Sequence, residues 1–209
     1  MALILVSFLL FDGENWLALT ASLIGVTSLL FNAKGNPVGQ VIGIVFCLIY
    51  GFISWKYAYY GEMITYLGMT MPMSVVTLII WLRNPFKGNR LCVQVGRLRR
   101  RDLFWLVFLT VVITVVFGYL LAILHTANLA PSILSISTST IAVYLSWRRS
   151  PWFAVGYALN DLVLIVLWSL AAAQDPGAVS VLMCFVAFFA NDLYGFRNWR
   201  RMLCQQQTA

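Results

Sequence analysis

Seven long apolar stretches, separated by short polar connections, dominate this sequence. A helix needs about 20 residues to cross the roughly 30 Å hydrocarbon core of a bilayer, and each stretch comes close to that length. Only 10% of the residues are charged, against about 25% in a soluble globular domain. The sequence therefore predicts an all-α integral membrane protein whose seven helices cover residues 16–31, 38–57, 64–82, 103–124, 130–147, 152–173 and 178–196.

Basic residues are distributed unevenly between the connections. If the seven helices alternate in direction, all 14 Lys and Arg except Lys56 fall on the same side of the membrane. Loops rich in Lys and Arg stay in the cytoplasm, so the pattern predicts a cytoplasmic C terminus and an N terminus outside. The most basic segment, residues 83–102, is interpreted as a loop that anchors to the membrane surface, and nucleic acid is not an expected partner.

The chain also carries a weak internal repeat. A shift of 114 residues, the distance from Pro37 to Pro151, also places Arg83-Asn84 on Arg197-Asn198 without a gap. A three-helix unit keeps its orientation on duplication only if one extra helix joins the copies. The sequence thus predicts a 3+1+3 arrangement of parallel repeats, as in SWEET-type transporters. The predicted divisions are a short N-terminal segment (1–14), a first three-helix repeat (15–84), a basic cytoplasmic loop with the linker helix (85–129) and a second three-helix repeat (130–209).

Two adjacent Asn-Asp pairs interrupt the last two apolar stretches. Counted from the basic residues that end these stretches, Asn160 and Asn191 lie roughly 16 Å and 14 Å from the cytoplasmic boundary, close to the midplane. A charged residue at that depth costs at least about 2.5 to 3.5 kcal/mol and normally faces a bundle interior or a wet cavity. Asp161 and Asp192 are therefore predicted to line a polar site, with hydrogen bonding between helices as the alternative.

Aromatic and amide side chains share helix faces with these pairs, and Gln40 and Tyr50 in the second helix are candidates for the opposite wall. Such a surface suits a flat heteroaromatic ligand, because aromatic faces stack it while amides donate and accept hydrogen bonds. Within each Asn-Asp pair we expect the asparagine to contact the ligand and the aspartate to orient it. The predicted substrate-binding residues are Gln40, Tyr50, Asn160, Asp161, Trp168, Asn191, Asp192, Tyr194 and Asn198.

Small and weakly polar residues form a stripe along the first helix of each repeat. Gly25, Ser28 and Asn32 belong to the first stripe, and Ser135 and Ser139 belong to its counterpart 114 residues later. Small residues let helix backbones approach closely in a membrane. Both stripes are therefore interpreted as packing surfaces.

Four segments carry a resemblance to a known family: residues 39–63, 71–81, 159–168 and 191–199. Their most specific parts are Tyr-Gly-Glu at 60–62 and the pattern Asn-x-x-Tyr-Gly-x-x-Asn-Trp that ends at Trp199. In these motifs, and in their order along all seven helices, the chain resembles the PnuC family of bacterial vitamin transporters. The best-known members of that family carry nicotinamide riboside.

The resemblance implies a protein of the bacterial inner membrane that takes up nicotinamide riboside by facilitated diffusion (uniport), made effectively one-way by phosphorylation inside the cell. It implies a functional link to a cytoplasmic kinase without a required contact, and it allows a homo-oligomer such as a trimer. Relatives of the same build are thought to carry thiamine or riboflavin, so these substrates stay as alternatives. Ser74 and Val143 stand where many members have glutamine. These two differences leave the shape of the pocket, and with it the identity of the substrate, undetermined.

Several other classes of protein fit less well. A rhodopsin needs a Schiff-base lysine in its last helix, and that stretch has none. The sole histidine, His125, falls at the end of the fourth helix, so an enzyme is not expected. No GxxxxGK phosphate loop exists, so transport driven directly by ATP is not expected. The four cysteines lack paired spacing, which argues against a disulfide, a metal site or a cofactor. Proton-coupled symport through Asp161 and Asp192 and a seven-helix receptor stay open as alternatives.

Overall fold

The computed structural model describes residues 16–126 and 128–208, so the predicted N-terminal segment 1–14 lies outside the described residues. The described elements are α2 (Trp16–Ala33), α3 (Val38–Lys56), α4 (Tyr60–Ile64), η1 (Thr65–Thr70), α5 (Met71–Arg83), β1 (Pro85–Phe86), β2 (Asn89–Val93), α6 (Arg100–Ile123), α7 (Leu129–Trp147), α8 (Phe153–Ala172), η2 (Pro176–Ala178) and α9 (Val179–Thr208).

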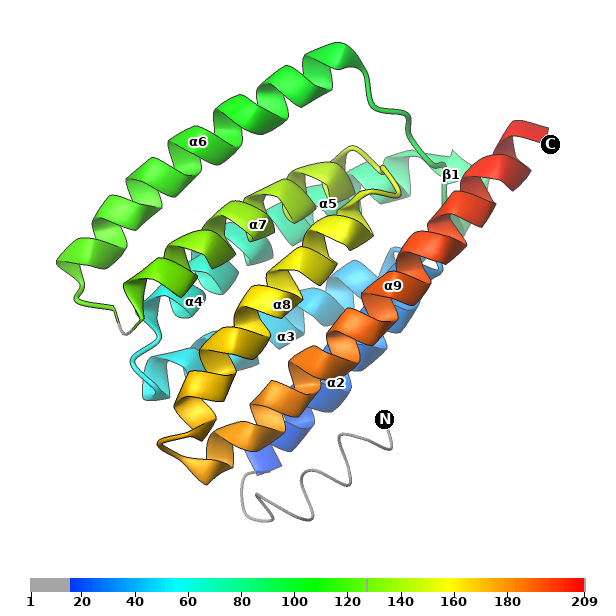
Figure 1. The fold of residues 1–209 in the computed structure, drawn as a ribbon. Coiled ribbons are helices and arrows are strands. Elements are labelled where there is room, and N and C mark those ends of the chain that lie inside the picture. The colour runs from blue at the N-terminus through cyan, green and yellow to red at the C-terminus, as the bar shows by residue number, and fades with distance from the viewer. Residues whose placement is uncertain (1–15, 127, 209) are drawn as a thin grey trace.

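The long helices run side by side as one bundle, with α6 at its edge (Figure 1). Six helical segments of the described chain are long and apolar enough to cross a membrane, and one of them, Tyr60–Arg83, is α4, η1 and α5 joined end to end. The apolar part of α2, Leu19–Ala33, is shorter. The prediction of an all-helical membrane bundle is confirmed at the level of six to seven apolar helices.

The third of the predicted helices changes its hydrogen-bonding pattern midway. Pro72 has no N–H, so it cannot donate to the carbonyl of Gly68 four residues earlier, as an α-helix requires. The chain is π-helical over Thr65–Thr70, and Met71 donates to the carbonyl of Tyr66 five residues back. Such π-helical turns are frequent at functional sites. This one belongs to the wall of the cavity described below.

Contacts between helices divide the bundle into a packed centre and an outlying helix. The pairs α2–α3, α7–α8 and α8–α9 pack closely, α2 also packs on α9, and α7 packs on α4 and α5. Helix α6 packs chiefly on α7 and exposes large apolar side chains such as Phe104, Val107 and Tyr119. Lipid tails are as apolar as these side chains, so the exposed surface of α6 suits a bilayer.

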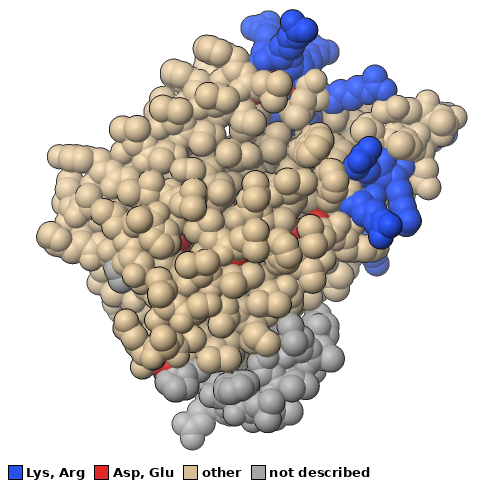
Figure 2. Space-filling model, viewed as in Figure 1, with Lys and Arg blue, Asp and Glu red and all other residues tan. Residues whose placement is uncertain are grey.

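The basic residues gather at one end of the bundle, as their segregation in the sequence predicted, and Figure 2 shows this for one face of the molecule. Hydrogen bonds tie the basic loop to the helix ends there. Val93 donates to the carbonyl of Gly35 (3.0 Å), and Gly96 donates to the carbonyl of Arg149 (2.9 Å). The Gln206 amide in α9 bonds the backbone of the same loop.

The basic loop therefore has more structure than a membrane-surface anchor needs. Its strands β1 and β2 pair antiparallel, and the turn between them uses positive φ angles at Lys87 (49°) and Gly88 (81°), as two-residue hairpin turns prefer. Further along, Arg148 at the end of α7 pairs with Asp102 in the first turn of α6, at 2.7 Å. The loop is thus a packed cap on the basic end of the bundle.

Candidate substrate site

A cavity of about 70 Å³ lies between α2, α3, η1, α5, α8 and α9. Its wall combines carboxyl groups, amides, hydroxyls and aromatic rings, and its described lining residues include no Lys, Arg or His. A volume of this size holds a few water molecules, whereas pockets for drug-sized ligands measure about 300 to 1,000 Å³. The cavity is therefore smaller than a pocket for a drug-sized ligand.

Asp161 of α8 and Asp192 of α9 form a carboxyl pair in the cavity wall. Each residue is only 4% exposed, and the two carboxyl groups lie close enough to interact electrostatically. A buried carboxylate is costly to ionise unless a cation or hydrogen-bond donors pair with it. The Oδ2 atom of Asp161 is buried and has no hydrogen-bond partner among the described residues. It is therefore an unsatisfied acceptor on a residue of the cavity wall.

A chain of polar side chains connects α2 and α3 on another wall of the cavity. The Gln40 amide donates to Oδ1 of Asn32 (3.0 Å), Asn32 donates to the Ser28 hydroxyl (3.4 Å), and Ser28 donates to the carbonyl of Gly39 (2.7 Å). A Cβ atom at Gly39 would collide with Asn32, so glycine is needed for this close approach. The result is a fixed row of amide and hydroxyl groups.

Aromatic rings supply much of the remaining wall. Phe46 of α3 packs edge to face on Phe188 of α9, with ring centroids 5.4 Å apart, and on Tyr66 of η1, at 5.9 Å. Phe153 and Tyr157 of α8 complete this part of the lining. The aromatic part of the cavity wall is therefore shared by α3, η1, α8 and α9.

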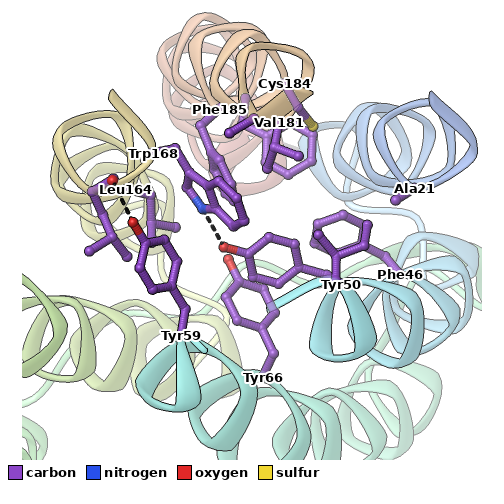
Figure 3. Packing of buried hydrophobic residues seen from close by; sticks show 14 of the residues in the cluster. Ala21, Phe46, Tyr50, Tyr59, Tyr66, Leu164, Trp168, Val181, Cys184 and Phe185 are labelled. Atoms are coloured by element: carbon purple, nitrogen blue, oxygen red, sulfur yellow. Dashed lines mark hydrogen bonds between the residues drawn. The ribbon is translucent and has the colours of Figure 1, made fainter. Parts of the chain in front are cut away.

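Two of the predicted substrate residues, Tyr50 and Trp168, lie behind the cavity instead of lining it. They meet in a buried aromatic cluster (Figure 3), where the Trp168 indole N–H donates to the Tyr50 hydroxyl at 2.8 Å. The Tyr50 ring packs on Tyr66 with centroids 4.4 Å apart and on Phe46 at 5.4 Å. These two side chains therefore position the rings that line the cavity.

Asn160 faces α7. Its Oδ1 atom accepts hydrogen bonds from the hydroxyls of Ser135 (3.2 Å), Thr138 (2.9 Å) and Ser139 (2.9 Å). We expected Asn160 to contact the ligand and Asp161 to orient it, whereas in the structure Asp161 lines the cavity and Asn160 joins two helices. Helix neighbours point about 100° apart, so only one member of such a pair can face the cavity.

The remaining predicted residues are spread along α9. Asp192 lines the cavity and its neighbour Asn191 does not, although the Nδ2 atom of Asn191 is buried without a partner in the described structure. Tyr194 is exposed on the outside of the bundle. Asn198 donates to the carbonyl of Ala33 at 2.8 Å, far from the carboxyl pair along the helix. Of the nine predicted residues, the structure brings Gln40, Asp161 and Asp192 together at the cavity.

Several lining residues were missed from the sequence. Ser28 and Asn32 were interpreted as a packing stripe, yet both line the cavity. The matching stripe on α7 includes Ser135 and Ser139, which hold Asn160. The signal in the sequence that could have found them is Asn32 itself, a full amide within a row of small residues. The aromatic lining residues such as Phe46 carry no such signal, because apolar side chains are common in every membrane helix and do not mark a site.

A family model described as "Nicotinamide mononucleotide transporter" matches residues 15–201. The chain belongs to this family. The match agrees with the PnuC resemblance drawn from the motifs, which is confirmed, and it makes the protein a membrane transporter and not an enzyme.

Two curated relatives are PnuC proteins, each named as a nicotinamide riboside transporter. That of Neisseria mucosa is 24% identical over 200 residues, covering 92% of this chain and 75% of the relative. That of Haemophilus influenzae is 22% identical over 194 residues, covering 91% and 81%. A solved crystal structure of the vitamin B3 transporter PnuC has a TM-score of 0.84 at 22% identity, covering 98% of this chain and 90% of the other. The fold is thus that of a PnuC protein along nearly the whole chain.

Proposed function

We propose that this chain takes up nicotinamide riboside across the bacterial inner membrane by facilitated diffusion, and that phosphorylation inside the cell traps the product. Its curated PnuC relatives are named for the riboside, whereas the family description names the mononucleotide. These two molecules differ by a phosphate group. The choice between them therefore depends on whether the cavity wall attracts or repels a negatively charged phosphate.

The charge of the cavity wall is the observation that carries the proposal. Its described lining includes Asp161 and Asp192 and no Lys, Arg or His. Phosphate groups are normally bound by Arg or Lys side chains or by helix N-termini, and a phosphate placed against two buried carboxyl groups is repelled. A nucleoside fits this wall better than a nucleotide does. The aromatic rings suit its flat base, and Gln40 with Asn32 suits its carboxamide and ribose hydroxyls.

The packing of the helices supports a 3+1+3 arrangement with the cavity between the repeats. Under the shift of 114 residues, α2, α3 and α4–α5 correspond to α7, α8 and α9. The contacts correspond as well: α2–α3 matches α7–α8, α3–α5 matches α8–α9, and α2–α9 matches α7 with α4–α5. Helix α6 has no counterpart and lies at the edge. In transporters with parallel repeats, the substrate site lies at the repeat interface near the midplane.

We further propose that the basic end of the bundle is cytoplasmic, with the N terminus outside, by the positive-inside rule. The small cavity then represents one stage of alternating access. In another stage, Phe46 and Phe188 move to admit the substrate. Proton coupling through the carboxyl pair is the mechanistic alternative. Its support is that two neighbouring carboxyl groups line the cavity, an arrangement that a uniporter can also have.

Flux into liposomes that contain no kinase tests this proposal. We expect labelled nicotinamide riboside to enter until the inner concentration equals the outer one, with or without a pH gradient. Accumulation above the external concentration under an inward proton gradient would mean symport, and binding without flux would mean a receptor. A calorimetric panel with the mononucleotide, thiamine and riboflavin tests the substrate. Tighter binding of the mononucleotide than of the riboside would overturn the argument from charge.

A further inference from the structure

We propose that Asp161 and Asp192 are the counter-charge for a permanently cationic heteroaromatic ring, so that this transporter selects its substrate by positive charge. Nicotinamide riboside carries such a charge on its pyridinium nitrogen, and its two-electron-reduced dihydro form has the same skeleton without the charge. The inference rests on the proposed function and extends it by naming the substrate feature that is selected and the residues that select it.

The first support is an unsatisfied acceptor on a residue of the cavity wall. Asp161 is buried, with only 4% of its surface exposed, it lines the cavity, and its Oδ2 atom has no hydrogen-bond partner among the described residues. Buried carboxyl oxygens are normally paired with a donor or a cation. A group left without either, beside a cavity, indicates that the missing partner enters with the ligand.

The second support is a balance of charge. Two carboxyl groups, those of Asp161 and Asp192, stand in the cavity wall, and each of them that ionises brings one negative charge. The described lining of the cavity offers no positive side chain to neutralise this charge. One pyridinium ring neutralises it, whereas a neutral ring leaves the charge without a partner among buried side chains.

The third support is the kind of ring that surrounds the pair. Phe46, Phe188, Tyr157 and Phe153 line the same cavity. The faces of aromatic rings attract cations, so these side chains add to the preference for a charged ring. A hydrophobic lining alone would favour a neutral heterocycle instead. The combination of aromatic faces with an uncompensated negative charge is specific to a flat organic cation.

The test compares binding of nicotinamide riboside and its dihydro form to the purified wild-type protein by calorimetry. We expect the charged form to bind at least about tenfold more tightly, because a buried charged contact is stronger than a neutral one. Asp161→Asn and Asp192→Asn should each weaken binding of the charged form about tenfold and change binding of the dihydro form less than about threefold. Asp175→Asn, an exposed aspartate in the connection between α8 and α9, is the matched control and should leave the ratio unchanged.

Equal affinity of the wild-type protein for both forms, within about threefold, overturns the inference and leaves the proposed function standing. This comparison needs no variant, so it decides the matter even if Asp161→Asn or Asp192→Asn fails to fold. Thiamine, which is cationic, and riboflavin, which is neutral, separate the two proposals. If thiamine alone binds, the inference holds and the proposed substrate is wrong. If riboflavin binds at least as tightly as the cations, or if no ligand binds, the inference fails.

Discussion

Trp199 donates its indole N–H to the backbone carbonyl of Asn32, 2.8 Å away, although 167 positions separate the two residues. The neighbouring Asn198 donates to the carbonyl of Ala33, also at 2.8 Å. The last carbonyls of a helix have no partner within it, and α2 ends at Ala33. The Asn-Trp part of the family signature therefore caps α2 and fixes the backbone of Asn32, whose side chain lines the cavity.

The first prediction concerns this cap. Trp199 is fully buried, with its ring 4.8 Å from that of Phe153 and 5.3 Å from that of Trp81. The carbonyl of Asn32 also accepts from the Gly35 N–H at 2.9 Å. Replacing Trp199 with phenylalanine removes one of these two hydrogen bonds, which costs about 0.5 to 1.5 kcal/mol. Trp199→Phe should therefore lower the thermal midpoint of the detergent-purified protein by several degrees. Trp152→Phe, at an exposed tryptophan, is the control, and an equal loss in both variants would contradict the capping role.

The second prediction distinguishes the structural role of Asn160 from the ligand-binding role of Asp161. Asn160→Ala removes the acceptor shared by three hydroxyls of α7, so it should destabilise the unliganded protein by about 1 to 3 kcal/mol. Its affinity for nicotinamide riboside should change less than that of Asp161→Asn. Thermal unfolding and calorimetry of both variants measure this division. Ser169→Ala, at an exposed residue that bonds within its own helix, is the control. A stable Asn160→Ala protein that no longer binds would restore the asparagine as the contact residue.

Asn160 and Asp161 also show which features of the site cannot be predicted from the sequence. Depth in the membrane was enough to predict that the two Asn-Asp pairs face a common polar surface, because a charged residue inside a bilayer normally faces a bundle interior or a wet cavity. The two aspartates do line one cavity. Which member faces the cavity depends on the rotation of α8 about its axis. That rotation is set by contacts such as Gly156 against Ala142, where an added Cβ would lie 2.8 Å from Cα. The same limit explains Tyr194, which shares a sequence motif with Trp199 but faces outward.

The third prediction concerns Glu62 of α4, which is fully buried. Neither of its carboxyl oxygens has a hydrogen-bond partner of normal geometry in the described structure, although Ser135 lies close to it. A buried carboxyl group without a cation is costly when ionised. Glu62→Gln keeps the shape without the charge, so its thermal midpoint should equal or exceed that of the wild type. Glu62→Ala leaves a cavity and should lower it. A large loss in Glu62→Gln would show that Glu62 has a partner that needs the charge.

The fourth prediction tests the close contact between α7 and α8. Gly156→Ala places a methyl group against the backbone of Ala142, and backbone atoms of a packed helix cannot move aside easily. Overpacking of this kind costs about 1 to 3 kcal/mol. The matched control is Gly68→Ala, where the nearest atom to the new methyl group is 3.8 Å away. We expect a lower thermal midpoint only for Gly156→Ala, and equal midpoints would mean that α7 and α8 are less tightly packed.

The fifth prediction addresses the polar wall formed by α2 and α3. Gln40→Leu removes the donor to Oδ1 of Asn32 and the amide that faces the cavity, while it preserves the approximate volume. Loss of a hydrogen bond between neutral groups is worth about 0.5 to 1.5 kcal/mol, so the affinity for nicotinamide riboside should fall roughly three- to tenfold. Gln205→Leu, at an exposed glutamine of α9, is the control. Unchanged affinity in a folded Gln40→Leu protein would show that the ligand is held by the aromatic rings and the carboxyl pair alone.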